Sequence, residues 1–257
     1  MYNTFSEDYD RFVNWDSRLA YEMPFIEKQI NLLQGSKNRP LDILDSACGT
    51  GMHAIQLASA GHQVSAADLF PQMIAKARQN ASNAGVPVNF QTAGLGNMAE
   101  TFGTAQFDLL LCLGNSLPHL ITAQELLETL QDFTDVLRPG GMLFIQNRNF
   151  DAVMQRQERW MEPQLYQEGG AEWIFQRFYD FLPNGLIRFN IATLHHKLDS
   201  DWQSGVTSTI LRPQMSAELE QQLQQVGFEE IRTFGSMQGE AFSPASSGNL
   251  IITAIKP

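Results

Sequence analysis

The sequence predicts an α/β protein built on a doubly wound parallel sheet, and three observations support this fold class. The stretch Leu41–Gly51 combines a short apolar strand with a glycine turn that opens a helix. From there to about residue 150, apolar runs alternate with helix-compatible segments, which predicts a parallel sheet with helices on both faces. Asp68 ends the second strand, at the edge where such sheets bind ligands.

The alternation sets the expected elements in order. Strands are expected at 41–46, 62–68, 86–91, 107–113 and 141–147, and helices at 51–60, 71–84 and 123–137. After residue 151 the pattern changes. Residues 172–182 and 186–198 are rich in aromatic and β-branched residues and flank Pro183-Asn184-Gly185, so they predict an antiparallel hairpin. A third strand is expected at 206–211, followed by a helix at 217–226 and strands at 228–234 and 248–255.

The segment before Pro40 has a periodicity of its own. Apolar side chains recur at helical spacing as far as Gly35, and residues 36–40 have the composition of a linker. We therefore expect three parts. They are an N-terminal helical cap over 1–38, a Rossmann-like ligand-binding domain over 39–150 and 211–257, and an inserted layer of antiparallel strands over 151–210 that covers the active site.

Composition excludes several classes of partner. The 257 residues include 17 Lys and Arg against 28 Asp and Glu, a net charge of −11 that opposes binding to nucleic acid and to anionic membranes. The start of the chain has no signal-peptide pattern and no segment is apolar enough to span a membrane, so we expect a cytoplasmic protein. Cys48 and Cys112 are expected to be small, reduced packing residues. No metal is expected, because the adjacent His195 and His196 would point to opposite faces of a strand.

The form of the glycine turn narrows the ligand. A dinucleotide fingerprint needs a third glycine, but Gly49-Thr50-Gly51 is followed by Met52-His53-Ala54, and the lysine of a P-loop is absent as well. Asp68 lies 19 residues beyond Gly49, where a carboxylate can accept hydrogen bonds from ribose hydroxyls. This pattern indicates a nucleoside-containing ligand that needs no pyrophosphate.

Four motifs in this order resemble the class I S-adenosylmethionine-dependent methyltransferases. Asp45–Gly51 resembles their motif I, and Asp68–Met73 resembles their acidic second motif. Phe107–Cys112 and Leu137–Gly141 are similar to later landmarks of the family, so the resemblance spans about 41–150. It implies a seven-stranded Rossmann-like sheet of the class I methyltransferase type and S-adenosylmethionine as cofactor.

The resemblance also implies where the cofactor binds. Backbone at the glycine turn would hold the methionine moiety, Asp68 the ribose, and two apolar side chains the adenine. The implied cofactor contacts are Asp45, Ala47, Cys48, Gly49, Gly51, Asp68, Leu69, Met73, Leu95, Leu113 and His119. In place of the family's acidic or amide residue at the adenine amino group, this chain offers the backbone of Leu95 or the side chain of Asn97, and we favour Leu95.

Two further segments suggest the methyl acceptor. Leu113–Leu120 is similar to the segment after the fourth strand in glycine N-methyltransferases and glycine/sarcosine methyltransferases, and Arg148–Asp151 resembles their Arg-Asn-Tyr-Asp run. This implies that Asn115 and Arg148 carry the reaction by holding the carboxylate of the acceptor, an anion-bearing small amine. A guanidinium fork matches a carboxylate bidentately.

The tyrosine-rich substrate contacts of the glycine enzymes do not align, because this chain has Leu211-Arg212-Pro213-Gln214 where Tyr-Tyr-Pro-His is expected. Four tyrosines are candidates for those roles: Tyr9, Tyr21, Tyr166 and Tyr179. We favour Tyr9 and Tyr21.

Alternatives remain at this stage. Arg148 could form a salt bridge with Asp151, and His119 could cap the helix that follows Pro118. The protein could be a small-molecule O-methyltransferase, a nicotinamide-dependent oxidoreductase, which the missing third glycine disfavours, or a cofactor-binding protein without catalysis.

Overall fold

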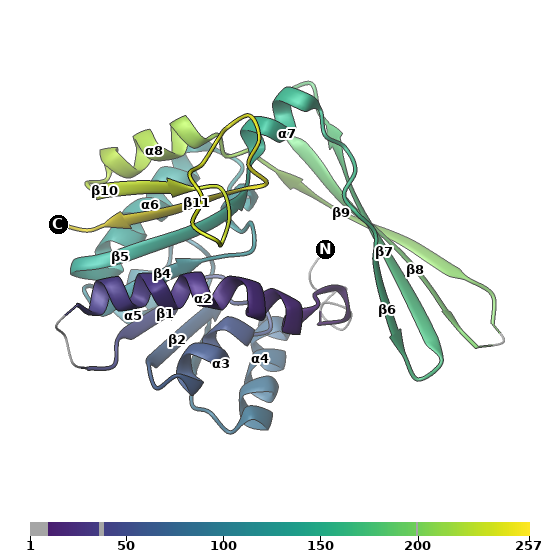
Figure 1. Cartoon of the computed structure of the whole chain (residues 1–257), viewed down its shortest axis with the longest axis horizontal. Helices are drawn as coiled ribbons and strands as arrows, with labels where there is room; N and C mark the ends of the chain where they lie inside the picture. Colours follow the sequence, from purple (N-terminus) through teal and green to yellow (C-terminus); the bar gives the residue numbers. More distant parts are fainter. Residues whose placement is uncertain (1–9, 36–38, 199) are drawn as a thin grey trace.

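A seven-stranded sheet forms the centre of the molecule. The computed structural model describes residues 10–35, 39–198 and 200–257, and Figure 1 shows their arrangement. Strand order is β10-β11-β5-β4-β1-β2-β3. The strands are β1 (Asp42–Asp45), β2 (Gln63–Asp68), β3 (Asn89–Thr92), β4 (Phe107–Cys112), β5 (Leu137–Arg148), β10 (Glu229–Phe234) and β11 (Asn249–Ile255). From β3 to β5 all neighbours are parallel, whereas β11 is antiparallel to both β5 and β10.

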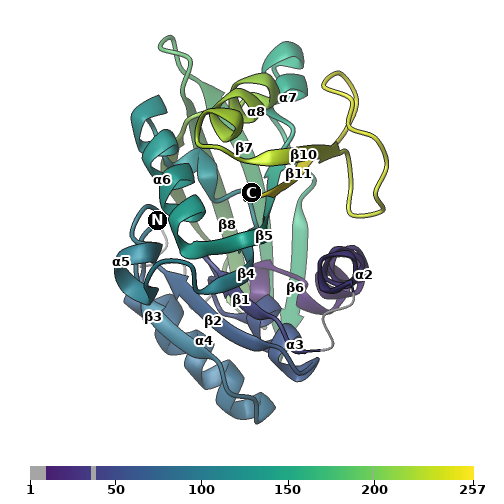
Figure 2. The ribbon, with the colours of Figure 1, turned by 90° about the vertical axis from the view of Figure 1, so that its left-hand side faces the viewer.

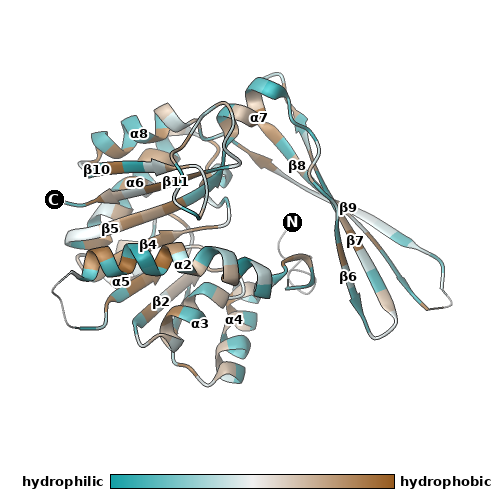
Figure 3. Cartoon of the chain, viewed as in Figure 1, coloured by the Kyte–Doolittle hydropathy of each residue, from teal (hydrophilic) through white to brown (hydrophobic). Residues whose placement is uncertain are grey.

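Helices cover both faces of this sheet, as predicted (Figure 2). On one face lie α2 (Trp15–Gln34), α3 (Met52–Ser59) and α4 (Pro71–Ala84); on the other lie α5 (Met98–Phe102), α6 (Ala123–Val136) and α8 (Ser216–Gln225). The central strands are apolar because helices cover both faces of the sheet (Figure 3). In β4, Leu109 and Leu111 enter one core while Leu110 and Cys112 enter the other.

A second, antiparallel sheet extends beyond the end of the first (Figure 1). It follows α7 (Phe150–Arg156) and contains β6 (Gln164–Glu168), β7 (Ala171–Phe181), β8 (Ile187–Lys197) and β9 (Gln203–Leu211), in that order. The predicted hairpin is confirmed, because β7 and β8 pair along their whole length around Pro183-Asn184-Gly185. Backbone N–H of Arg212 donates to the carbonyl of Pro118 at 2.8 Å, which ties the end of β9 to the short helix η1 (Leu117–His119).

Three short elements escape the sequence pattern. β6 is a mostly polar edge strand of five residues, and α5 and α7 contain five and seven. None of the three is long enough to show a hydrophobic periodicity from which a helix or a strand could be predicted. β5 also begins at Leu137 rather than at 141, because backbone pairing continues through a register irregularity beside Phe107.

The N-terminal helix α2 is fastened to α3 by a buried polar network. Glu22 accepts hydrogen bonds from Nε of Arg18 at 3.1 Å, and its Oε2 lies 2.7 Å from Nε2 of His53. These contacts with Arg18 and His53 lower the pKa of Glu22 against the effect of its burial, while burial lowers the pKa of His53. Asp10, just before α2, accepts hydrogen bonds from the hydroxyl of Thr50 and the indole of Trp15, so this segment lies on the glycine turn.

Replacing Glu22 with leucine is expected to lower the free energy of unfolding by about 3 kcal/mol, because the substitution leaves a buried cation without its carboxylate. Urea denaturation measures this as a lower midpoint at unchanged slope. Glu27→Leu is the matched control, because Glu27 is exposed on the same helix. Equal stability of the two variants would show that the network does not hold α2 in place.

The structure also bears on the cysteines and on membrane-spanning helices. Cys48 and Cys112 are both free and buried, as predicted. Among the described residues, no helix combines the length and the apolar character needed to cross a membrane.

Candidate active site

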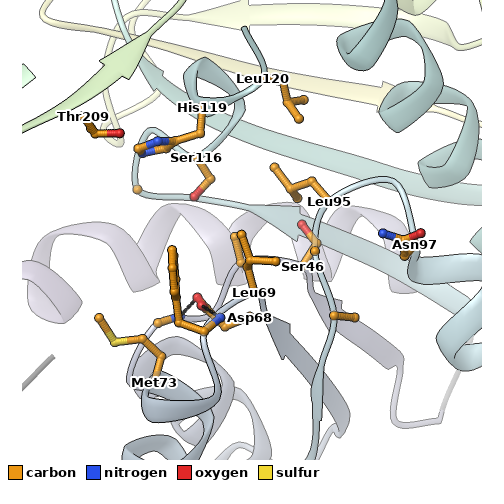
Figure 4. Close-up of a pocket in the computed structure, with 16 residues that line it drawn as sticks. Ser46, Asp68, Leu69, Met73, Leu95, Asn97, Ser116, His119, Leu120 and Thr209 are labelled. Atoms are coloured by element: carbon orange, nitrogen blue, oxygen red, sulfur yellow. Dashed lines mark hydrogen bonds between the residues drawn. The ribbon is translucent and has the colours of Figure 1, made fainter. Parts of the chain in front are cut away.

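A cavity of about 380 Å³ lies at the carboxyl ends of the parallel strands (Figure 4). Its walls come from the loops that follow β1, β2, β3 and β4, together with one residue of β9. The lining residues are Ser46, Ala47, Gly49, Asp68, Leu69, Phe70, Met73, Ala93, Gly94, Leu95, Asn97, Gly114, Ser116, His119, Leu120 and Thr209. This is the edge of the sheet at which the sequence places a ligand.

The glycine turn is held by hydrogen bonds to neighbouring strands. The hydroxyl of Ser46 donates to the carbonyl of Leu111 at 2.9 Å, and the N–H of Cys48 donates to the carbonyl of Ala67 at 2.8 Å. Gly51 has φ +81°, and a Cβ there would lie 2.9 Å from Cβ of Ala77. Gly51 therefore allows the turn to pack against α4, and its own position is not on the cavity wall.

Asp68 joins the first two loops of the site. Its Oδ2 accepts a hydrogen bond from the N–H of Gly49 and its Oδ1 accepts one from the N–H of Phe70, both at 2.9 Å. Burial raises the pKa of Asp68, and these two N–H donors oppose the rise. Each carboxylate oxygen has a further lone pair, so the group can accept hydrogen bonds from a ligand as well.

Asp45 is the second acidic residue at this edge, and it is 1% exposed. Its Oδ1 has no hydrogen-bond partner among the described residues, although the carboxylate accepts a bond from the backbone N–H of Ala47. Burial, together with the nearby charge of Asp68, raises the pKa of Asp45 to about 7. A cationic ligand group beside such a carboxylate favours its ionised form, so the carboxylate loses its proton when the ligand binds.

This shift predicts pH-dependent binding of S-adenosylhomocysteine, which carries the same methionine ammonium group as S-adenosylmethionine. If the ammonium prefers ionised Asp45, binding releases a proton and affinity rises about 10-fold between pH 6 and pH 8, given a pKa of about 7. Calorimetry in two buffers of different ionisation enthalpy measures the released proton directly. Asp45→Asn should bind with an affinity that does not vary over this range; a pH profile identical to that of the unmodified protein would contradict the assignment.

Apolar side chains form the other end of the cavity. Leu69 is 61% exposed at its rim, and Met73, Leu95 and Leu120 complete the wall. Exposed leucine beside a cavity marks a surface that an apolar ligand face can cover. Leu95 and Asn97 both line this end, so both of the alternatives for the adenine amino group lie in place.

A second cavity of about 550 Å³ adjoins the first, and the two share Gly114 and His119. It is walled by α2 and the residues before it, by the ends of β4 and β5, and by the inner side of the second sheet. Its lining residues are Phe12, Val13, Asn14, Ser17, Arg18, Tyr21, Glu22, Gly114, Asn115, His119, Gln146, Arg148, Met161, Gln164, Arg177, Tyr179, Phe189, Ile191, Leu211 and Asn249. We call it the acceptor chamber.

Asn115 and Arg148 both line the acceptor chamber. Oδ1 of Asn115 accepts a hydrogen bond from the backbone N–H of Arg148 at 3.0 Å, which leaves the Nδ2 group of Asn115 as a donor. Asn115 adopts φ +66°, a conformation that asparagine tolerates better than most residues. The Nε of Arg148 is buried without a hydrogen-bond partner in the described structure.

Arg148 does form a salt bridge, but its partner is Glu158 and not Asp151. Nη2 of Arg148 lies 3.3 Å from Oε2 of Glu158, whereas Asp151 accepts a hydrogen bond from the N–H of Ser216 at the start of α8. Glu158 is 43% exposed, so this ion pair is largely solvated. The amide of Asn149 donates to three carbonyls of the 243–247 loop, which fixes the backbone beside Arg148.

His119 stands at the junction of the two cavities. Burial lowers the pKa of His119 to about 4, so its ring is neutral at physiological pH. The helix that follows is capped by Thr122, whose side chain and Glu125 form a capping box, so the alternative role of His119 as a helix cap is wrong.

The structure sorts the expected site residues as follows. Seven of them line the first cavity, namely Ala47, Gly49, Asp68, Leu69, Met73, Leu95 and His119. Three line the acceptor chamber, namely Asn115, Arg148 and Tyr21. Asp45, Cys48, Gly51 and Leu113 lie behind the cavity walls, and Tyr9 is outside the described residues.

Sequence reasoning missed Arg18, Arg177, Ser116 and Thr209, which line one cavity or the other. A Cβ at Gly114 would lie 3.4 Å from Nη2 of Arg18, so this guanidinium reaches the junction of the two cavities. Arg18 lies in the amphipathic helix α2, and nothing in the helical pattern predicts that its side chain reaches a cavity.

The residues present fit S-adenosylmethionine. The acceptor capacity of Asp68 fits a ribose, and the apolar wall around Met73 fits an adenine. Residues 43–141 match the family model described as a methyltransferase domain. Together with the strand order of the sheet, this match shows that the chain is a methyltransferase that uses S-adenosylmethionine and has the class I fold.

Comparison with individual proteins gives a finer similarity. The chain is 29% identical over 234 residues to a glycine/sarcosine N-methyltransferase of Aphanothece halophytica, covering 91% of this chain and 82% of that protein. A solved S-adenosylmethionine-dependent methyltransferase from Clostridium acetobutylicum has a TM-score of 0.75 at 16% identity, covering 99% and 98% of the two chains. An S-adenosylmethionine-bound amino pentose methyltransferase from Micromonospora echinaspora has a TM-score of 0.67 at 18% identity, covering 95% and 92%.

Proposed function

We propose that this enzyme methylates the amino nitrogen of a small acceptor that also carries a carboxylate, as glycine and sarcosine do. The observation that carries the proposal is the acceptor chamber, in which Arg148 and Asn115 present donors beside the first cavity, which we call the cofactor cavity. The similarity to glycine/sarcosine N-methyltransferases supports the same substrate class.

In the cofactor cavity, Asp68 would accept hydrogen bonds from the ribose, while Leu69 and Met73 would contact the adenine. The backbone from Ala47 to Gly49 would hold the methionine moiety, with Asp45 near its ammonium group. When bound, S-adenosylmethionine supplies a methyl group that is already activated by the positive sulfur. The protein therefore has to position the acceptor and exclude water, and no strong base is required.

The residues of the chamber can perform that positioning. Arg148 and Nδ2 of Asn115 would hold the carboxylate of the acceptor, which directs its amine toward the junction at Gly114 and His119. The neutral ring of His119 places no positive charge there. Enclosure by the second sheet and α2 removes water, and this favours the neutral, nucleophilic form of the amine.

An assay of purified protein tests the proposal. With S-adenosylmethionine as donor, we expect methylation of amines that carry a carboxylate and none of a panel of phenols and carboxylic acids without an amine. Methylation of phenols alone would favour the O-methyltransferase alternative. Absence of turnover with every amino acid tried would contradict the proposal.

A further inference from the structure

Arg177 occupies an unusual place on the inner side of the second sheet. Side chains alternate across a strand, so Phe175, Arg177 and Tyr179 of β7 share one face. Phe175 and Tyr179 are 0% and 2% exposed, and Ile191, which pairs with Arg177 from β8, is 2% exposed. A guanidinium therefore interrupts a row of buried apolar and aromatic side chains that faces the acceptor chamber.

No carboxylate of the described residues pairs with Arg177. Its Nε is buried without a hydrogen-bond partner, and its Cζ lies 5.2 Å from the ring centroid of Phe12. A cation–π contact attracts the charge, but it leaves the Nε–H donor unsatisfied, and a buried donor without a partner is destabilising. Packing alone does not explain why an arginine stands here.

The other two arginines of the chamber differ in this respect. Arg18 pairs with Glu22, and Arg148 lies near Glu158. Among the described side chains that line the chamber, three are arginines (Arg18, Arg148 and Arg177) and one is acidic (Glu22), although the whole chain has a net charge of −11. Burial lowers the pKa of Arg177, neighbouring Tyr179 opposes this fall and Arg148 adds to it, yet an arginine stays protonated in proteins. The chamber is thus a cationic site in an acidic protein.

We infer that Arg177 binds a second anionic group of the methyl acceptor, so that the preferred acceptor is an amino dicarboxylate rather than glycine. This inference rests on the proposed function, because it takes Arg148 and Asn115 to hold the first carboxylate. Arg148 and Arg177 both line the chamber, so their guanidinium groups provide two separate sites for charge-assisted hydrogen bonds. A chamber of about 550 Å³ also has the size of pockets that enclose ligands much larger than glycine.

Acceptor selectivity tests the inference. We compare kcat/KM for aspartate, glutamate, glycine and sarcosine in the unmodified enzyme, Arg177→Met and the control Arg188→Met, whose side chain is exposed on β8. The unmodified enzyme is expected to favour a dicarboxylate by about 10- to 100-fold, the size of one charged hydrogen-bonding site. Arg177→Met is expected to lose that preference, because kcat/KM falls by this factor more for the dicarboxylates than for glycine, whereas Arg188→Met keeps the preference. A preference for glycine in the unmodified enzyme, or equal loss for all acceptors in Arg177→Met, would overturn it.

Binding separates this inference from the proposed function. Calorimetry measures aspartate and glutamate binding to the complex with S-adenosylhomocysteine, whose own affinity reports whether each variant is folded. Dicarboxylate binding that depends on Arg177 without any methylation would refute the proposed function and retain the second anion site. Absence of dicarboxylate binding would refute the inference. If Arg177→Met does not fold, Arg177→Lys takes its place, and it should lower the affinity for dicarboxylates more than that for glycine because it lacks the guanidinium fork.

Discussion

Replacement of Asp68 by alanine is expected to weaken the binding of S-adenosylhomocysteine by at least about 100-fold. The carboxylate holds the N–H groups of Gly49 and Phe70, so its removal frees two loops of the cavity at once. The same change removes the acceptor that we assign to the ribose. Each charge-assisted hydrogen bond contributes about 1.5–3 kcal/mol, and the two effects act on the same ligand. Calorimetric titration measures the change in affinity.

The controls for this prediction separate cavity shape from charge. Asp68→Asn keeps one acceptor oxygen and should lie between alanine and the unmodified protein. Asp135→Ala removes an exposed carboxylate from α6 and should leave affinity unchanged. Cofactor affinity in Asp68→Ala equal to that in Asp135→Ala would mean that Asp68 is only a strand-end residue.

The second large effect is expected from Arg148→Met. Loss of a half-buried guanidinium that binds the acceptor carboxylate should lower kcat/KM for the acceptor by about 100- to 1000-fold, through a higher KM. Affinity for S-adenosylhomocysteine should stay the same, because Arg148 lines the acceptor chamber and not the cofactor cavity. Steady-state kinetics with saturating cofactor measures the effect.

Two companion variants define what Arg148 does. Arg148→Lys keeps the charge but loses the fork of donors, so it should recover only part of the activity. Arg232→Met removes an exposed arginine from β10 and should behave as the unmodified enzyme. An unchanged KM in Arg148→Met would refute the carboxylate site and leave the ion pair with Glu158 as the role of this residue.

Much of the cofactor cavity could be predicted from local sequence. Strand, glycine turn and helix follow one another within residues 41–60, and Asp68 ends the next strand. Parallel strands bring their carboxyl ends to one edge, so the position of each loop follows from chain order alone. The deviations lie in short or polar elements such as β6 and α7, where no period can be established.

The acceptor chamber could be predicted only in part. Asn115 follows β4 and Arg148 ends β5, so the same rule brings both residues to the edge of the sheet. Arg18 and Arg177 belong to a helix and to a strand of another sheet, and no local pattern relates them to that edge. A polar residue at an apolar position of β7 was the one available signal, and its meaning depends on which side of the strand faces inward.

By itself, the sequence determined the doubly wound sheet, the glycine turn and the carboxylate at Asp68, because these depend on hydrophobic periodicity and on residues that follow consecutive strands. Tertiary structure alone decided how the second sheet and α2 enclose a chamber and which charges meet inside it. Whether a buried guanidinium has a partner depends on residues far apart in the chain. Arg18 meets Glu22 and Arg148 meets Glu158, whereas Arg177 meets no carboxylate of the described residues.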